Sequence, residues 1–189
     1  MNRRRLQGWY AAAVITLTAV VATSPLQACG LEPAINGGFS VSHPRSLDVA
    51  VAVAKARRDG LLPPAPSKSP SNDVLLRLMI ADIRRMQSHL KSGRSALDNG
   101  SSAPFSLVLV GPGLWSHFHL TSAGVLARYH VDGPLAGRPV VLTHYAVLEA
   151  LLDGSLALAQ AAENGLLVFA GDDIQPVQKV FQLGFRPRA

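Results

Sequence analysis

The stretch "LLDGSLALAQAAENGLLVFAGDD", residues 151–173, decides the fold that we predict for this chain. It holds two short apolar pieces, which end at Gly154 and at Asn164-Gly165. Because glycine readily takes the left-handed conformation that closes a helix, these pieces predict two short helices. The apolar run at 166–170 has the length of a strand and should be buried on both faces. Almost none of its side chains is reactive, so its apolar residues are the candidates for a functional role.

The segments on either side of this stretch predict a sheet and a last helix. Upstream, four short apolar runs are separated by turn residues, as in a meandering, mostly antiparallel sheet. These runs are residues 105–111, 114–120, 125–131 and 140–143. Downstream, Asp172 and Asp173 should cap a final amphipathic helix with Pro176 in its first turn. The fold class that follows is α/β, of the α+β kind, with five strands.

Two further helices are predicted before the sheet. One begins at Asn72 and ends at Gly93, with apolar residues at helical spacing between them. The other, residues 46–58, starts at Ser46 as N-cap and has an acidic first turn and a basic last turn, which the helix dipole favours. Its alternating valines also fit a strand. Residues 61–72 hold four prolines and three serines and are typical of a linker.

The order of elements in residues 107–185 resembles the sterol-carrier-protein family, also called the SCP-2-like domain. The resemblance is sharpest at residues 154–156 and 165–167, which match two "GxL" motifs, and at 171–172, which match an "xGD" motif. It implies a mostly antiparallel five-stranded sheet with helices on one face. It also implies an apolar cavity between sheet and helices that binds lipids, sterols or acyl chains. Residues 29–72 have no counterpart in the family.

A cavity of this kind needs apolar walls, and the resemblance places them on the C-terminal helices. The candidate ligand-binding residues are Leu148, Leu152, Leu156, Leu158, Val177, Phe181 and Phe185, with Trp115 from the sheet as a weaker candidate. The alternative is that these side chains pack on the sheet as an ordinary core.

Histidines supply a weaker candidate site of another kind. His117 and His119 lie two apart on a predicted strand and therefore point to the same face. Two imidazoles on one face could bind copper or zinc. A pair of histidines on the outer face of a sheet is also a common surface feature, and no cysteine or methionine cluster supports a metal here.

Catalytic motifs are absent from the sequence. It contains no G-x-S-x-G elbow, no H-E-x-x-H, no phosphate loop and no C-x-x-C. We therefore expect no catalytic residue and no cofactor.

The N-terminus has the order of an export signal. Residues 3–5 are arginines, an apolar run follows at 9–22, and small residues precede Cys29. "LQAC" resembles the lipobox of bacterial lipoproteins, in which the cysteine is lipidated. The alternatives are an uncleaved anchor, and a simple cut near residue 28 that leaves Cys29 as a free thiol. Cys29 is the only cysteine, so no internal disulfide can form.

These features divide the chain into three parts and limit its partners. The parts are a signal peptide at 1–28, an N-terminal segment with one helix and the linker at 29–72, and the sterol-carrier-like domain at 73–189. Without residues 1–28, 15 basic residues face 12 acidic ones. This balance is too mild to indicate a nucleic-acid partner.

The function expected from the sequence is that of an exported, periplasmic, membrane-anchored protein that holds a lipid or another apolar small molecule. It would be a non-catalytic binding or accessory protein beside an enzyme or another protein. The alternatives are a protein–protein interaction module with a collapsed core, and a periplasmic histidine metal binder.

Overall fold

The computed structural model describes residues 41–68, 70–96 and 103–186. The expected signal peptide at 1–28 and the lipidation site Cys29 lie outside the described residues. Among the described residues, no helix is both long and apolar enough to cross a membrane.

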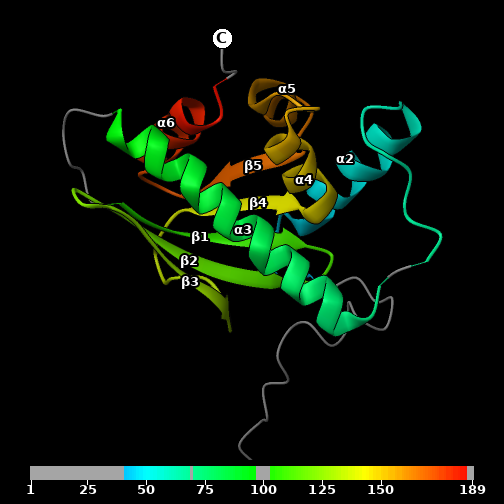
Figure 1. The fold of residues 1–189 in the computed structure, drawn as a ribbon, viewed down its shortest axis with the longest axis horizontal. Helices are drawn as coiled ribbons and strands as arrows, with labels where there is room; N and C mark the ends of the chain where they lie inside the picture. The colour runs from blue at the N-terminus through cyan, green and yellow to red at the C-terminus, as the bar shows by residue number, and fades with distance from the viewer. Residues whose placement is uncertain (1–40, 69, 97–102, 187–189) are drawn as a thin grey trace, which may run out of the picture.

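The described chain forms an α+β fold. In order along the chain, its elements are α2 (Ser46–Arg58), α3 (Asn72–Ser95), β1 (Ala103–Val110), β2 (Leu114–Thr121), β3 (Gly124–Val131), β4 (Val140–His144), α4 (Tyr145–Asp153), α5 (Leu158–Glu163), β5 (Leu167–Ala170) and α6 (Gln175–Gly184) (Figure 1). The predicted fold class and its five strands are confirmed, and residues 46–58 form a helix rather than a strand.

The sheet is mixed, which refines the prediction of a meandering antiparallel arrangement. Its strands lie in the order β3-β2-β1-β4-β5. Three of the neighbouring pairs are antiparallel, whereas β1 and β4 are parallel. The hairpin β2–β3 and the loop after it lie between β1 and β4 in sequence, so the chain crosses back before β4 pairs with β1.

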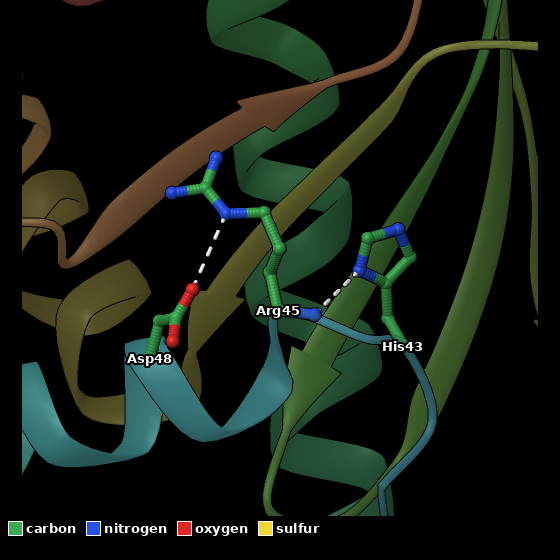
Figure 2. A network of polar contacts seen from close by, with 3 residues as sticks. All are labelled: His43, Arg45 and Asp48. Carbon is green, nitrogen blue, oxygen red and sulfur yellow. Dashed lines mark hydrogen bonds and ion pairs between the residues drawn. The ribbon is translucent and has the colours of Figure 1, made fainter.

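Helices cover both faces of this sheet. On one face, Phe105 of β1 stacks on Phe118 of β2 at 5.0 Å and meets the edge of Phe181 in α6 at 6.0 Å. Helices α3 and α4 lie on the same side as α6 (Figure 1). The helix α2 lies on the other face: Figure 2 shows it in front of the strands, with α3 behind them. The expectation of helices on one face therefore describes α3, α4 and α6, and α2 adds a helix to the second face.

The start of α2 is held by a compact turn. The backbone N–H of His43 donates to Ser46 Oγ at 3.0 Å, and the N–H of Ser46 donates to the carbonyl of His43 at 2.9 Å. Arg45 bridges the turn, because its N–H donates to His43 Nδ1 at 3.1 Å and its Nε to Asp48 at 3.4 Å (Figure 2). Ser46 is thus a buried first residue of the helix and not its N-cap.

The helix α2 belongs to the same hydrophobic core as the rest of the described chain. Val49, Val53 and Ala56 are buried, and Leu62 of the Pro-rich segment is buried with them. The division of the chain at residue 72 stays a prediction. The packing of α2 nevertheless means that residues 73–189 alone would expose a sheet face that α2 now covers.

The helix α3 does not end at Gly93, as the sequence suggested, but continues to Ser95. A Cβ atom at Gly93 would lie 2.3 Å from the carbonyl oxygen of Val180, and one at Gly184 would lie 2.4 Å from the carbonyl oxygen of His89. These two glycines allow α3 and α6 to cross with their backbones in contact. Gly93 therefore serves close packing, which a helix-stop interpretation overlooks.

The expected cap of α6 is also different in the structure, and α4 is capped by a residue other than Thr143. Thr143 can cap α4 in principle, but its hydroxyl donates to the carbonyl of Leu166 and His144 is the N-cap. At α6 the N-cap is Ile174, without a side-chain hydrogen bond, so Asp172 and Asp173 do not cap this helix.

Candidate functional site: a groove between α4, α5 and α6

An apolar groove opens where the end of α4 and the start of α5 face the end of α6. Its volume is about 690 Å³. Pockets that bind small molecules commonly range from about 300 to 1,000 Å³. The lining residues come from α3, α4, α5, α6 and the α4–α5 connection: His89, Leu151, Leu152, Asp153, Gly154, Leu156, Ala157, Leu158, Ala159, Gln182, Gly184, Phe185 and Arg186.

The floor of the groove is aliphatic and is set by the way α4 ends. Gly154 closes α4 in the left-handed conformation, with φ +80°. The chain then turns back, and the N–H of Leu156 donates to the carbonyl of Ala150 at 3.0 Å. This turn buries Leu156 beside Leu151 and Leu152, which are buried as well.

An aromatic stack forms the opposite wall. The ring of Phe185 stacks on the imidazole of His89 at 4.8 Å and on Phe181 at 5.9 Å. His89 Nδ1 lies 3.1 Å from the carbonyl oxygen of Gly184, which can only accept, so Nδ1 carries the proton and donates. The stack and this hydrogen bond fix Phe185 just beyond the last turn of α6.

The rim of the groove is polar. Asp153, Gln182 and Arg186 line it and are exposed to solvent. An apolar floor with a polar rim can hold a molecule that has an apolar body and one polar end.

The structure separates the sequence-derived ligand candidates into two groups. Leu152, Leu156, Leu158 and Phe185 line the groove. The others do not line it but belong to the hydrophobic core: Leu148, Val177, Phe181 and Trp115. Among these, Phe181 reaches the groove indirectly, because it stacks under Phe185.

Sequence reasoning missed part of the lining. His89, Gln182 and Arg186 also line the groove, but because they are polar the sequence did not predict them as part of an apolar lining. A signal for His89 was present, since it follows Met86 by three positions and therefore lies at the edge of the buried face of α3. Nothing in the sequence alone indicated that α6 ends beside α4.

The predicted histidine pair lies away from the groove, on the sheet. His117 Nε2 lies 2.7 Å from the carbonyl oxygen of Gly133, and His119 is exposed. Since that carbonyl can only accept, His117 Nε2 carries a proton in this arrangement and is not available to a metal. Within the described ranges, no group of three or more His, Cys, Asp and Glu side chains could hold a metal ion.

A polar contact joins α4 to α3 at the other end of α4 from the groove. The hydroxyl of Tyr145 donates to Asp82 at 3.0 Å. Burial, followed by this hydrogen bond and the nearby carboxylates, raises the pKa of Tyr145 above its ordinary value. Burial is also the main cause that raises the pKa of the Glu149 carboxyl, with a further contribution from Asp82. This cluster holds the first turn of α4 in place and leaves the last turn to form the groove.

Comparisons with known proteins show a likeness in fold to solved structures. A scan against models of protein families found none that matches the chain, and no curated protein matches it either. The sec-alkylsulfatase Pisa1 from Pseudomonas sp. is 15% identical, with a TM-score of 0.36 over 51% of this chain and 14% of the sulfatase. A double mutant of that sulfatase is 19% identical, with a TM-score of 0.42 over 69% of this chain and 20% of its own. This chain thus spans a fifth or less of the sulfatases that it resembles.

A smaller protein is also similar. A conserved hypothetical protein from Thermus thermophilus, described as a possible sterol carrier protein, is 15% identical with a TM-score of 0.35. The similarity covers 57% of this chain and 83% of the Thermus protein. These likenesses concern the fold.

Proposed function

We propose that this chain is an exported, non-catalytic protein that binds an apolar small molecule, such as a lipid or an acyl chain, in the groove between α4, α5 and α6. The observation that carries the proposal is the aliphatic floor of that groove, built from Leu151, Leu152 and Leu156. The proposed binding site differs from the one expected from the sterol-carrier resemblance. It lies between helices and not between the sheet and the helices.

The energetics of an apolar groove suit a ligand without strong polar contacts. Each methylene withdrawn from water contributes about 0.8 kcal/mol, so about ten methylenes contribute about 8 kcal/mol before the costs of ordering the ligand. Only the surplus of this gain over those costs sets the dissociation constant. The floor and Phe185 supply the contacts, and the rim leaves a polar end in water.

The helix α5 is the element best suited to widen the groove. It has six residues, of which only Ala161 is buried. Gly154 and Gly165 flank it, both with positive φ, and a Cβ atom added at either would meet no atom closer than ordinary van der Waals contact. A short helix held by one buried residue and the half-buried Leu158 can shift at low energetic cost.

The test is extraction of the full-length protein with organic solvent, followed by mass spectrometry of the extract and by uptake of added fatty acid. We expect a stoichiometric apolar molecule in the extract or saturable uptake. Empty extracts together with no uptake would contradict the proposal.

A pair of substitutions on α5 locates the binding. Ala159 lines the groove, whereas Ala162 is also exposed on α5 but does not line it. Ala159→Trp should fill the groove and lower uptake about tenfold, which corresponds to about 1.4 kcal/mol. Ala162→Trp should leave uptake unchanged. Equal losses in both variants would mean that the ligand is not in the groove.

The proposed export and membrane anchoring rest on the N-terminal sequence alone. If Cys29 is lipidated, Cys29→Ala should move the protein from the membrane fraction to the soluble fraction of the producing cell. An unchanged membrane fraction would exclude lipidation as the anchor.

One observation favours the interaction module as a second candidate function. On the outer side of α2, Leu47 is 60% exposed and Val51, one turn later, is 59% exposed. Apolar side chains at this spacing are typical of a helix face that contacts a partner protein. Under this alternative, Val51→Asp should abolish copurification of a specific protein and leave lipid uptake unchanged.

A further inference from the structure

A second, smaller cavity lies on the opposite face of the sheet from the groove. Its volume is about 190 Å³. It is bounded by α2 and by the ends of β1 and β4 and is open to solvent on one side, and its lining residues are Ala50, Val53, Ala54, Arg57, Val110, Gly111 and His144. We call it the Arg57–His144 pocket. The function proposed for the groove makes no use of it.

His144 presents a proton donor at this pocket. Its Nδ1 accepts from the N–H of Ala146 at 3.1 Å, which caps α4. Because Nδ1 accepts, the proton of the neutral ring must be on Nε2. The Nε2 and Cδ2 atoms face Gly111, where a Cβ would lie 3.6 Å from each, so the missing side chain keeps this edge of the ring accessible.

The imidazole stays neutral over the physiological range. Burial, followed by the positive charge of Arg57, lowers the pKa of His144 to about 4. At neutral pH the ring therefore acts as a fixed donor and not as a second cation.

Arg57 presents the second donor. Its Nε is buried and has no hydrogen-bond partner within the described residues. A buried donor without an acceptor is destabilising, and more so when the group is charged, so the guanidinium is expected to bind an acceptor.

The remaining lining residues indicate the charge of the acceptor and the kind of group attached to it. Among the described residues, no acidic side chain lines the pocket, so the guanidinium is not neutralised from within. The other lining residues are apolar or glycine, and among them Ala50 and Ala54 keep accessible surface, whereas Val53 and Val110 are buried behind them. An acceptor with a negative charge and a short apolar tail can accept from both donors and cover the apolar lining. A fully polar anion would leave the apolar lining exposed to water.

We propose that the Arg57–His144 pocket binds a small monocarboxylate with a short aliphatic tail. One carboxylate oxygen accepts from the Arg57 guanidinium and the other from His144 Nε2, and the tail packs on Ala50 and Ala54, which line the pocket and are not buried. The site is independent of the groove, because it lies on the α2 face of the sheet.

The experiment titrates the full-length protein with sodium butyrate, followed by calorimetry and by NMR of ¹⁵N-labelled histidine. We expect saturable binding that shifts the Nε2 signal of His144 and raises the pKa of that ring, because a negative charge then lies beside it. The signal of His89, which lines the groove, should not change. Butyramide, which has the same shape without the charge, should bind about tenfold more weakly or worse.

Matched variants assign the binding to the pocket. Arg57→Gln should weaken butyrate binding about tenfold or more, whereas Arg58→Gln, which removes the same charge from an exposed neighbour, should not. His144→Asn keeps a residue that can cap α4 but removes the Nε2 donor, and it should also weaken binding. Circular dichroism checks that each variant folds.

Three results would overturn the proposal. They are no saturable butyrate binding by the wild-type protein, equal affinity for butyrate and butyramide, or a histidine shift confined to His89. If Arg57→Gln fails to fold, the comparison of butyrate with butyramide on the wild-type protein still decides.

Discussion

The long helix α3 meets its two helical neighbours in different ways. Against α6 it packs backbone to backbone, because Gly93 and Gly184 leave no side chain between the helices. Against α4 it makes a polar contact, in which Tyr145 donates to Asp82. The close crossing fixes α6, and the polar contact fixes only the first turn of α4. The far end of α4, with Gly154 and α5, is therefore free to form the groove.

The same residue type serves opposite purposes in these two regions. At Gly93 a Cβ would collide with the backbone of α6, whereas at Gly154 nothing lies within 4 Å and only the positive φ favours glycine. One glycine is required by its neighbours and the other by its own conformation. The predictions below separate these two causes.

The largest effect is expected at the close crossing. Gly93→Ala places a Cβ against the carbonyl of Val180 and the N–H of Gly184, and backbone atoms cannot move away as a side chain can. We expect a loss of about 3 kcal/mol in the free energy of unfolding, near the upper end for overpacking. Chemical denaturation of the full-length protein measures it.

The matched control is the same substitution at Gly154. There the added methyl group meets only its own strained backbone, for which we expect about 1 kcal/mol. Equal losses at the two positions would mean that the crossing of α3 and α6 is not close-packed.

The next effect concerns the junction between β4 and α4. The pKa of His144 is about 4 in the folded protein, below its ordinary value of 6.5. Above about pH 6.5 the ring is neutral in both states and costs nothing. As the pH falls towards 4, the unfolded chain binds the proton first, so the folded state loses about 2 kcal/mol near pH 5.

The measurement is the free energy of unfolding near pH 7 and near pH 5, for the wild-type protein and for His144→Asn. The variant can still cap α4 but has no titrating ring, so it should lose less stability on acidification. Carboxyl groups titrate in both proteins and cancel in this comparison. Identical pH dependences would show that His144 is not held neutral by burial.

A smaller effect is expected at the polar contact. Tyr145→Phe removes the hydrogen bond to Asp82 and keeps the ring, so it should cost about 1 kcal/mol. The loss should be accompanied by faster amide exchange in α4 and no change in α6. Faster exchange in α6 would mean that the two contacts of α3 are not separate.

The sequence was sufficient for most of the elements but not for their mutual arrangement. Gly154 and the apolar run at 166–170 are local signals, and the elements that they predict, the end of α4 and the strand β5, are present. Gly93 gave the same local signal, but glycine is needed there because α6, which lies about 90 residues further along the chain, packs against it. Long-range packing of this kind leaves no trace in a local pattern.

Only part of the candidate site was predictable, because part of it also depends on long-range packing. Leu152, Leu156 and Leu158 lie close together in sequence, at the end of α4, in the short connection and at the start of α5, so their shared location follows from the turn at Gly154. That Phe185 and His89 complete the wall depends on the close crossing of α3 and α6. That Leu148 packs into the core depends on the sheet beneath α4.

The most direct test of the central claim is photo-crosslinking of the full-length protein with a fatty acid that carries a diazirine near the end of its chain, followed by peptide mass spectrometry. The account predicts adducts in residues 151–159 and 182–186, lost in Ala159→Trp and retained in Ala162→Trp. Adducts on β2 around Trp115, or adducts that Ala159→Trp does not affect, would contradict it.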